Sequence, residues 1–539
     1  MKSREIPFQH NNDFYSAYLD GRPDVREQFD YNPFEQKSYQ ERWKEIQERS
    51  FPRESLHEHL ITYHQKFPTS IHTRTNIDKL KDSDSTVVVT GQQAGLLAGP
   101  LYTIHKCISA IRLAKEQERN LGTPVIPIFW IAGEDHDFDE INHIYIPATG
   151  RTNKKKLDLL EGNRSVSRIP LPKEKLSHWA EEIVRSLGET VHTQEVKDLI
   201  RDAIQDTETI TDFFAYIMLV LFAEEGIVML DSNHNKLREI ESTFFNELVE
   251  DNEKIDDTFQ KEIKMLKQKG FSVPVETESN QAHLFVEVHG NRVLLQRDGD
   301  AFRGKKNECM YTRNELAAIA TEQPERLSNN VVTRPLMQEN LLPTLAFVAG
   351  PGEIAYWGVL KSIFHEFGFK MPPVMPRLSL TILEPHIKKM MNEKELDLRN
   401  TIYGGVANAK QIWLDQRTEW DLNNEFTNAK EQIDKTHKVL RGMTIDIDNG
   451  LMPLAEKNGQ ILQEQLDFFK TKLEKSIQLK YEHELRKFHE IELNIKPDGK
   501  PQERVYNVVY YLNRYGFSFI TELTSLQYEW NGNPKVIYT

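Results

Sequence analysis

The chain is poor in cysteine, with Cys107 and Cys309 as the only two among 539 residues. Two cysteines can form neither a disulfide framework nor a cysteine-rich zinc site. Long apolar runs are also missing: the longest, 213–223, has eleven residues, against roughly 20 for a membrane-spanning helix. The first residues lack the apolar segment of a signal peptide. We therefore expect a soluble cytoplasmic protein with reduced thiols.

Basic residues are outnumbered by acidic ones, 68 to 82, which gives a formal net charge of −14. Such a balance argues against a dedicated nucleic-acid-binding protein. Charged residues of both signs are interleaved and make up 28% of the chain, so the composition does not indicate disorder. The length predicts roughly three to four domains.

Short apolar runs alternate with helix-like segments between residues 85 and 350. We expect strands at 85–90, 124–131, 227–231 and 344–349, and helices at about 101–118 and 209–225. Alternation of this kind predicts a parallel sheet with helices on both faces. The spacing is irregular, so we expect a core of residues 1–384 with insertions at about 145–208 and 255–335. The second insertion contains a hairpin signal centred on Gly290-Asn291.

The composition becomes helical and charged beyond residue 384. Apolar residues from Phe426 to Ile447 follow a heptad pattern, and after a break at 449–453 a second stripe runs from Leu462 to Ile491. We expect a helical domain over 385–495 formed by an antiparallel hairpin. It is either a coiled coil used for dimerisation or spacing, or a helical subdomain packed on the core. Residues 496–539 are expected to pack back on the core.

Residue types suited to anionic ligands follow the first expected strand. Ligands of open α/β sheets lie beyond the carboxyl ends of the strands, where glycines let the backbone approach a phosphate. We expect phosphate or carboxylate binding by Thr90, Gly91, Gln92, Gln93, Gly99, His105 and Lys106. The stretch is neither a Walker A loop nor GxGxxG. Alternatively, the glycines serve turns and the histidine and lysine are ordinary helix residues.

An acidic segment with one histidine, followed by a second at His143, comes after the second expected strand. It reads Glu-Asp-His-Asp-Phe-Asp-Glu over 134–140. An acid beside a histidine can fix the imidazole tautomer, and either can act as a base. We expect catalytic roles for Asp135, His136 and Asp137, and substrate binding by Asn142. Two alternatives stay open: a metal site of His136, Asp137 and His143, or an acidic helix start.

Three further groups complete the set of candidates. A glycine loop after the fourth strand offers Gly350, Gly352 and Glu353, with Tyr356 one turn later, unless it is only a tight turn. Arg377 beside Ser379 could clamp a phosphate, as could Arg334, unless these arginines form surface ion pairs. Asp231 closes the third strand and could accept from a ribose hydroxyl.

Together these motifs resemble the BshC family, the cysteine-adding enzymes of bacillithiol biosynthesis. The stretches that carry the resemblance are VVVTGQQAGLLAGPLYTIHKCISAIRLA, PIFWIAGEDHDFDEINH, TRPLMQENLLPTLAFVAGPGEIAYW and MPPVMPRLSLTILE. The resemblance runs from near the N-terminus to the end of the chain and includes the helical hairpin.

The resemblance implies a fold and an assembly. The fold is a Rossmann-like core similar to nucleotidyltransferases and class I aminoacyl-tRNA synthetases, with two connecting insertions. The antiparallel coiled coil would join two copies in a homodimer. The chain has neither the HIGH tetrapeptide nor the KMSKS loop of those synthetases. Residues 90–95 with His105 would take the place of the HIGH tetrapeptide, and residues 376–379 would take the place of the KMSKS loop.

The resemblance also implies an activity. The family is linked to the last step of bacillithiol synthesis, in which cysteine is added to glucosaminyl-malate through an amide bond. Activation of the cysteine carboxyl would use ATP as cofactor, or ADP would be the bound nucleotide. Mg would accompany the nucleotide as its counter-ion, and no protein-bound metal is expected. The expected partners are cysteine and glucosaminyl-malate, with no nucleic acid and no membrane.

The expected roles follow from the motifs. Gln92, Gln93 and the helix start would hold phosphate or carboxylate, and residues 135–137 would position the cysteine or the sugar amine. Residues 350–353 would form the floor, with Arg377 and Ser379 on the phosphate side. Two other functions stay open: a metal-dependent hydrolase built on residues 134–140, and a nucleotide-binding coiled-coil scaffold without catalysis.

Overall fold

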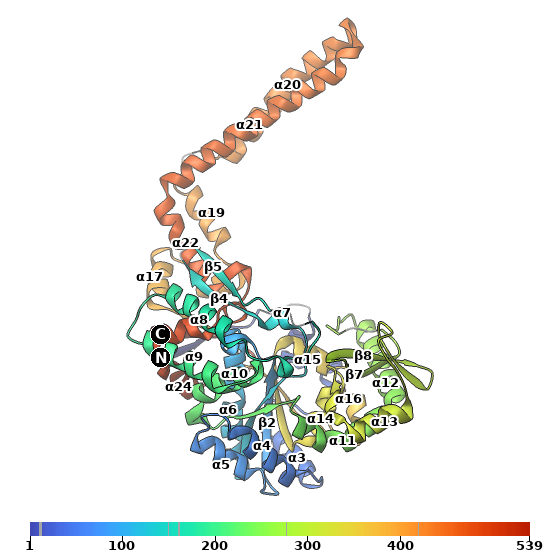
Figure 1. Ribbon diagram of the computed structural model, residues 1–539. Helices are drawn as coiled ribbons and strands as arrows, with labels where there is room; N and C mark the ends of the chain where they lie inside the picture. Colours follow the sequence, from blue (N-terminus) through green and yellow to red (C-terminus); the bar gives the residue numbers. More distant parts are fainter. Residues whose placement is uncertain (10–12, 149, 160–161, 276–277, 419) are drawn as a thin grey trace. The chain divides into compact units, whose positions relative to one another are not determined.

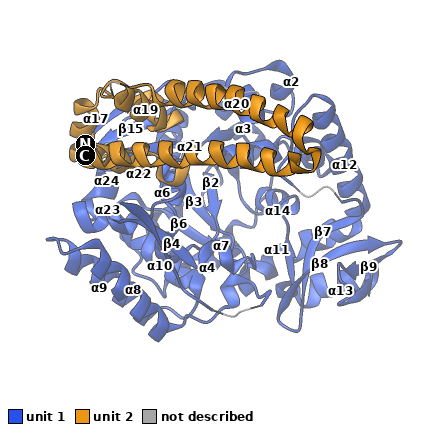
Figure 2. Cartoon of the chain, turned by 90° about the horizontal axis from the view of Figure 1, so that it is seen from above, with its two compact units in different colours: residues 1–382, 501–539 blue, residues 383–500 orange. Residues whose placement is uncertain are grey.

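The computed structural model describes residues 1–9, 13–148, 150–159, 162–275, 278–418 and 420–539. The chain forms two compact units, of which the first comprises residues 1–382 and 501–539 and the second residues 383–500 (Figure 2). The second unit therefore interrupts the chain of the first. Within the described residues, no helix is both long enough and apolar enough to cross a bilayer.

A five-stranded parallel sheet is the centre of the first unit (Figure 1). Its strands are β2 (Thr86–Gln92), β3 (Val125–Ile131), β6 (Val228–Asp231), β12 (Thr344–Ala349) and β13 (Val374–Pro376). They lie in the order β13-β12-β2-β3-β6, and each neighbouring pair is parallel. This is the doubly wound order, in which the direction of strand addition reverses between β2 and β12. The predicted α/β class is confirmed.

The four expected strands are present with ends shifted by two residues or fewer. Strand β13 was not expected, because its segment contains three prolines. It lies at the edge of the sheet, where a proline costs no ladder hydrogen bond.

Helices cover both faces of this sheet. Side chains from α6 (Leu101–Leu121) and α10 (Ile210–Leu221) pack in one buried cluster with Phe129 and Ile131 of β3. On the other face, Ile126 and Ile128 pack in a cluster with α4 (Arg53–His64) and α11 (Asn235–Glu250). Because side chains alternate between the two faces of a strand, the residues of one apolar run pack into two separate hydrophobic clusters.

The remaining helices of the first unit have the following bounds: α1 Phe14–Leu19, α2 Pro23–Arg26, α3 Gln36–Gln47, α4 Arg53–His64, α5 Ile71–Lys79, α7 Phe138–Ile141, α8 Lys173–Leu187, α9 Thr193–Asp206, α11 Asn235–Glu250, α12 Asn252–Gln268, α13 Arg313–Glu322, α14 Thr333–Leu341, α15 Pro351–Trp357, α16 Lys361–Glu366, α23 Val508–Tyr515 and α24 Ser518–Ser525.

The second expected insertion contains an antiparallel sheet in the order β10-β9-β8-β7-β11. Its strands are β7 (Gln281–Val288), β8 (Asn291–Asp298), β9 (Ala301–Gly304), β10 (Met310–Thr312) and β11 (Leu327–Asn329). The hairpin turn lies at His289 and Gly290, whose φ angles are 50° and 78°, as a type I′ turn requires. The expected centre of the turn was thus one residue too far along the chain. The first insertion contains a smaller hairpin of β4 (His143–Ala148) and β5 (Arg151–Lys156).

The two chain ends pair with each other. Strand β1 (Lys2–Glu5) is antiparallel to β15 (Lys535–Tyr538), and β15 also neighbours β14 (Leu380–Leu383). Strand β1 was not expected, because a polar four-residue strand has no local signal and pairs with residues at the far end of the chain.

The second unit is helical. Its helices are α17 (Pro385–Glu393), α18 (Leu398–Gly404), α19 (Ala407–Asp415), α20 (Leu422–Ile447), α21 (Met452–Lys480) and α22 (Glu482–Ile495). Helices α20 and α21 form the expected antiparallel hairpin (Figures 1 and 2). The residues buried between α20 and α21 are not all members of the expected apolar stripe. His437 is buried there, and a Cβ on Gly459 would come within 3.0 Å of its ring.

The histidine at the end of α4 should make stability depend on pH. His64 Nδ1 lies 2.8 Å from the Leu60 carbonyl, and Nε2 accepts from the Met229 amide of β6 at 3.1 Å. Only the neutral ring can make both bonds, and burial lowers the pKa of His64 to about 4. Because the unfolded chain protonates first, stability should be lost as the pH falls from about 6.5 towards 4, by about 2 kcal/mol at pH 5.

Urea unfolding at pH 7.5 and pH 5.0 measures this loss. The variant His64→Gln keeps a donor and an acceptor without a titrating ring, so its loss between the two pH values should be smaller by about that amount. His178→Gln, at an exposed position of α8, should leave the wild-type pH dependence unchanged. An equal loss in wild type and His64→Gln would show that His64 is not responsible.

Candidate functional site

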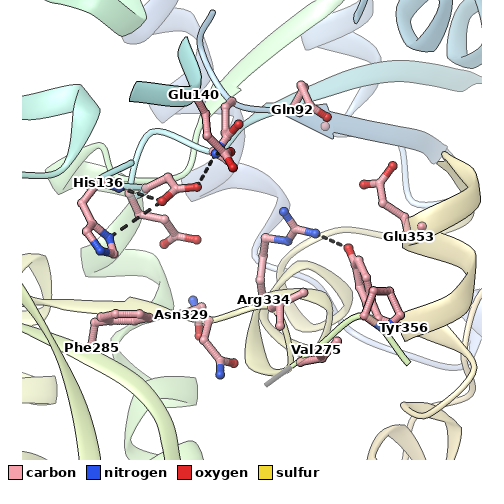
Figure 3. A pocket seen from close by; sticks show the side chains of 18 of the residues that line it. Gln92, His136, Glu140, Val275, Phe285, Asn329, Arg334, Glu353 and Tyr356 are labelled. Carbon is pink, nitrogen blue, oxygen red and sulfur yellow. Dashed lines mark hydrogen bonds and ion pairs between the residues drawn. The ribbon is translucent and has the colours of Figure 1, made fainter. Parts of the chain in front are cut away.

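A cavity of about 930 Å³ lies at the carboxyl ends of β2, β3, β12 and β13, where the strand order reverses (Figure 3). This volume is typical of small-molecule sites, which span about 300–1,000 Å³. Residues after the strands form one side, and the antiparallel insertion sheet forms another. Twelve of the candidate residues line the cavity: Gly91, Gln92, Gln93, Lys106, Asp135, His136, Arg334, Gly350, Gly352, Glu353, Tyr356 and Arg377.

The buried ammonium group of Lys106 joins the two sides of the reversal point. Nζ donates to the Gly91 carbonyl at 2.7 Å and to Gln92 Oε1 at 2.9 Å, both at the end of β2. It also lies 2.5 Å from Glu353 Oε2 on α15. Burial lowers the pKa of Lys106, and the Glu353 carboxylate opposes that shift. An ammonium has three donors, so Lys106 is fully used in positioning and has none left for a ligand.

Asp135 is the acceptor at the centre of a polar group beside Gln93. Its Oδ2 accepts from Gln93 Nε2 at 2.7 Å, and the same amide donates to Glu140 Oε2 at 2.8 Å (Figure 3). Burial would raise the pKa of Asp135, but the Gln93 hydrogen bond and the charge of Arg292 outweigh it and lower the pKa. Asp135 is therefore ionised at neutral pH and able to accept from a cationic or amino group.

His136 is held by the insertion sheet. Its Nδ1 lies 3.2 Å from Arg292 Nη1. Because an arginine only donates, Nδ1 must be the acceptor, and the neutral ring then carries its proton on Nε2. Burial and the charge of Arg292 lower the pKa of His136. In this geometry His136 is a neutral hydrogen-bond donor to the cavity rather than a base.

Arg334 is a cavity cation with an uncharged partner. From α14 its Nη2 donates to Tyr356 Oη at 2.5 Å (Figure 3). Among the described residues, no carboxylate lies within ion-pair distance of its guanidinium. Such a group can neutralise a phosphate or a carboxylate of a ligand.

Arg377, by contrast, is bound to a carboxylate from the last part of the chain. Its Nη1 and Nη2 donate to the two oxygens of Glu503, each at 2.7 Å. His105 Nδ1 lies 2.8 Å from Glu503 Oε2, and Ser379 Oγ donates to Oε1 at 3.1 Å. Glu503 belongs to a short 3₁₀ turn, η7 (Gln502–Arg504). His105 and Ser379 thus serve this buried cluster, and neither lines the cavity.

Five other expected residues also lie outside the cavity. Thr90 Oγ1 donates to the Val348 carbonyl inside the sheet. Gly99 lies in a turn with φ 68°, and its carbonyl accepts from the Asn507 side chain. Asn142 is buried and donates to Asp139. Asp231 is buried and accepts from Ser167 Oγ and the Asn233 amide.

The fifth, Asp137, lines a separate, smaller cavity that also touches His136. The structure therefore brings together two members of the expected catalytic trio at the main cavity, and places the third facing another way.

Gly91 lines the cavity, but a different contact explains why it is glycine. A Cβ at this position would lie 2.7 Å from the Trp130 carbonyl oxygen of β3. Real Cβ atoms do not approach that closely, so the glycine is needed for strand packing.

Several cavity residues had no signal in the sequence. Arg292, Gln281 and Asn329 come from the insertion sheet, and Arg504 from the C-terminal segment. Their positions in the chain give no indication of proximity to β2. Within the described ranges, no group of three His, Cys, Asp or Glu side chains is arranged to hold a metal ion.

Known proteins resemble the chain over its whole length. The family model described as Bacillithiol biosynthesis BshC, N-terminal Rossmann-like domain, matches residues 1–378, and the C-terminal coiled-coil domain of the same family matches residues 380–539. Relatives carrying the name "Putative cysteine ligase BshC" include proteins of Geobacillus sp. (strain WCH70), Geobacillus kaustophilus and Bacillus licheniformis. They are 44%, 41% and 39% identical, and each match covers 100% of both chains.

Removing the Glu503 carboxylate should destabilise the protein. Arg377 and Glu503 are 6% and 5% exposed, so Glu503→Gln would leave a buried guanidinium without a counter-charge. Loss of one partner from a buried pair costs about 3–5 kcal/mol. Urea unfolding at pH 7.5 measures the change. Glu522→Gln, at an exposed ion pair with the N-terminus, should change stability by about 0.5 kcal/mol or less. Equal effects would contradict a supporting role for Glu503.

Proposed function

The chain belongs to the BshC family of bacillithiol biosynthesis, and from that membership we propose that it is a ligase joining L-cysteine to glucosaminyl-malate with consumption of ATP. The carboxyl carbon of cysteine would form an amide bond with the glucosamine nitrogen, and one carboxyl oxygen would leave with phosphate. The observation that carries the proposal is the cavity at the strand-order reversal. It combines an arginine that has no carboxylate partner among the described residues with an ionised aspartate.

The nucleotide side of the proposal rests on Arg334 and the first turn of α15. A carboxylate does not condense with an amine unaided in water, and ATP would supply the group that makes the carboxyl oxygen a leaving group. Arg334 would pair with a phosphate. A Cβ on Gly352 would meet no atom within 4 Å, so the backbone at Gly352 borders open space that a phosphate could enter. Mg²⁺ would accompany the nucleotide as counter-ion. ATP and reduced thiols coexist in the cytoplasm, which is the proposed compartment.

The amine side rests on Asp135. An ionised carboxylate held by Gln93 can accept from the amine of the sugar, or from that of cysteine, and fix its orientation. His136, as a neutral donor, can bind a ligand oxygen without adding charge. An amine of pKa near 7–8 needs little help to lose its proton, so orientation should contribute most to the rate.

Product formation tests the function. Purified protein with cysteine, glucosaminyl-malate and ATP should yield the amide, detected by mass spectrometry. Release of AMP would indicate adenylyl activation, and release of ADP phosphoryl activation. Asp135→Asn removes the charge with little change of size, and turnover should fall by about 10²-fold because the amine is no longer oriented.

Two matched variants sharpen this test. Asp137→Asn should lower turnover far less than Asp135→Asn, because Asp137 does not line this cavity. Asp158→Asn, at an exposed position, is the control for a nearby loss of charge. Absence of the amide with all three substrates would reject the ligase proposal. A larger effect at Asp137 would reject the assignment to Asp135.

We also propose that two copies associate through the helical hairpin. Leu440, Met443 and Ile447 belong to the expected heptad stripe but are 52%, 50% and 79% exposed. The hairpin uses His437 in its own seam instead. An apolar row left outside the seam of a coiled coil fits the same row of a second copy.

Charges on that row should separate the copies. Leu440→Asp with Ile447→Asp is tolerable in a single chain, since both side chains are exposed, but buries two unpaired charges in a dimer. Sedimentation velocity over a range of protein concentrations should show a dimer for the wild type and a monomer for the variant. Val191→Asp, at a 92% exposed apolar residue of the first unit, should stay dimeric. A dimer in both would place the interface elsewhere.

A further inference from the structure

Two buried amides in the wall of the main cavity have polar atoms without a partner. Asn329 on β11 is 1% exposed and Gln281 on β7 is 3% exposed, and both line the cavity. Within the described part of the chain, neither Nδ2 nor Oδ1 of Asn329 makes a hydrogen bond, and neither does Nε2 of Gln281. Buried amide groups are normally paired, so these atoms call for an explanation.

The backbone that carries Asn329 is held firmly. Asn329 lies opposite Leu284 in the pairing of β11 with β7. Its carbonyl accepts from Arg292 Nη2 at 2.6 Å, and Arg292 is itself fixed by Ser328 Oγ and lies 3.7 Å from the centre of the Phe285 ring. The unpaired amide is therefore presented by a rigid strand rather than by a loop.

The next residue shows what a structural asparagine looks like here. The Asn330 amide nitrogen lies 3.0 Å from His283 Nδ1, and its oxygen accepts from the Val332 and Thr333 amides at the start of α14. The side chain of Asn330 therefore makes its hydrogen bonds within the protein and supports the fold. In Figure 3 the side chain of Asn329 instead appears among the residues around the cavity, between Phe285 and Arg334.

The chemistry of the free atoms narrows the choice of ligand group. An amide offers a donor and an acceptor side by side and no charge, so it does not select a phosphate or carboxylate. A hydroxyl group both donates and accepts, and neighbouring hydroxyls can satisfy Asn329 and Gln281 together. A stacked aromatic base is disfavoured, since Arg292 already lies over the Phe285 ring.

We propose that Asn329 and Gln281 form a subsite for the hydroxyl groups of a sugar. This inference rests on the proposed function for the two sugars available, the glucosamine of the acceptor substrate and the ribose of the nucleotide. The subsite would give specificity, because a site built to hydrogen-bond hydroxyls leaves its own groups unpaired when they are missing. Its wall faces the cavity from the insertion sheet, opposite the strand ends.

The variant Asn329→Leu separates binding from folding. Leucine has nearly the same shape and removes both unpaired atoms, so the melting temperature should stay the same or rise. Affinity for the sugar ligand, measured by calorimetry, should fall about tenfold or more. Titrations use glucosaminyl-malate and ATP separately. A loss confined to glucosaminyl-malate assigns the subsite to the acceptor sugar, and a loss confined to ATP assigns it to ribose.

A second variant and a control protect the test. Gln281→Met removes the other amide without branching, and it should weaken the same ligand as Asn329→Leu. Asn235→Leu, at an exposed amide at the start of α11, should keep wild-type affinity for both. Unchanged affinity for both ligands in Asn329→Leu and Gln281→Met would overturn the inference. So would a fall in melting temperature with affinity intact, since the amides would then support the fold.

The two proposals can fail separately. If the wild type binds glucosaminyl-malate and Asn329→Leu weakens that binding, but no amide forms with cysteine and ATP, the ligase proposal fails and the subsite stands. If the amide forms and both variants keep the wild-type KM for glucosaminyl-malate and for ATP, the ligase proposal stands and the subsite is rejected.

Discussion

The candidate site depends on one buried ammonium group. Lys106 reaches from the first turns of α6 to the last residues of β2 and to Glu353 on α15, and each of its three donors has an acceptor. A charge in that environment is tolerable only while all three bonds persist. The end of β2 and the start of α15, which flank the strand-order reversal, are thereby held at a fixed separation. Arg334 and Asp135, which both line the cavity, can then face the same space.

Much of the core was readable from the sequence, because parallel strands buried on both faces are short runs of β-branched and aromatic residues. The segments 344–349 and 125–131 carry that pattern and lie where it predicts. Strand β13 was not predicted, because its prolines normally mark loops. They are acceptable in this strand because it lies at the edge of the sheet. Strand β1 could not be predicted, because it pairs with residues more than 500 positions away.

The site was partly readable for a related reason: parallel strands end at one edge, so residues after each strand converge. That places Gln93, Asp135 and Glu353 together. It cannot reveal which polar residues are already committed to the fold. Arg377 and Lys106 have the residue types of ligand-binding cations, yet distant carboxylates occupy both. Nor can it reveal Arg292 and Asn329, which a separate sheet brings to the cavity.

Glu503 has a consequence for how the protein is made. It neutralises Arg377 and bonds to His105, but it leaves the ribosome after the whole of the second unit, residues 383–500. Throughout synthesis of that unit, a nascent first unit would hold a buried guanidinium lacking its counter-charge, and β1 would lack its partner strand. The cavity can therefore reach its final form only after nearly all of the chain has been translated. Truncated translation products would carry an incomplete site, however well their sheet had formed.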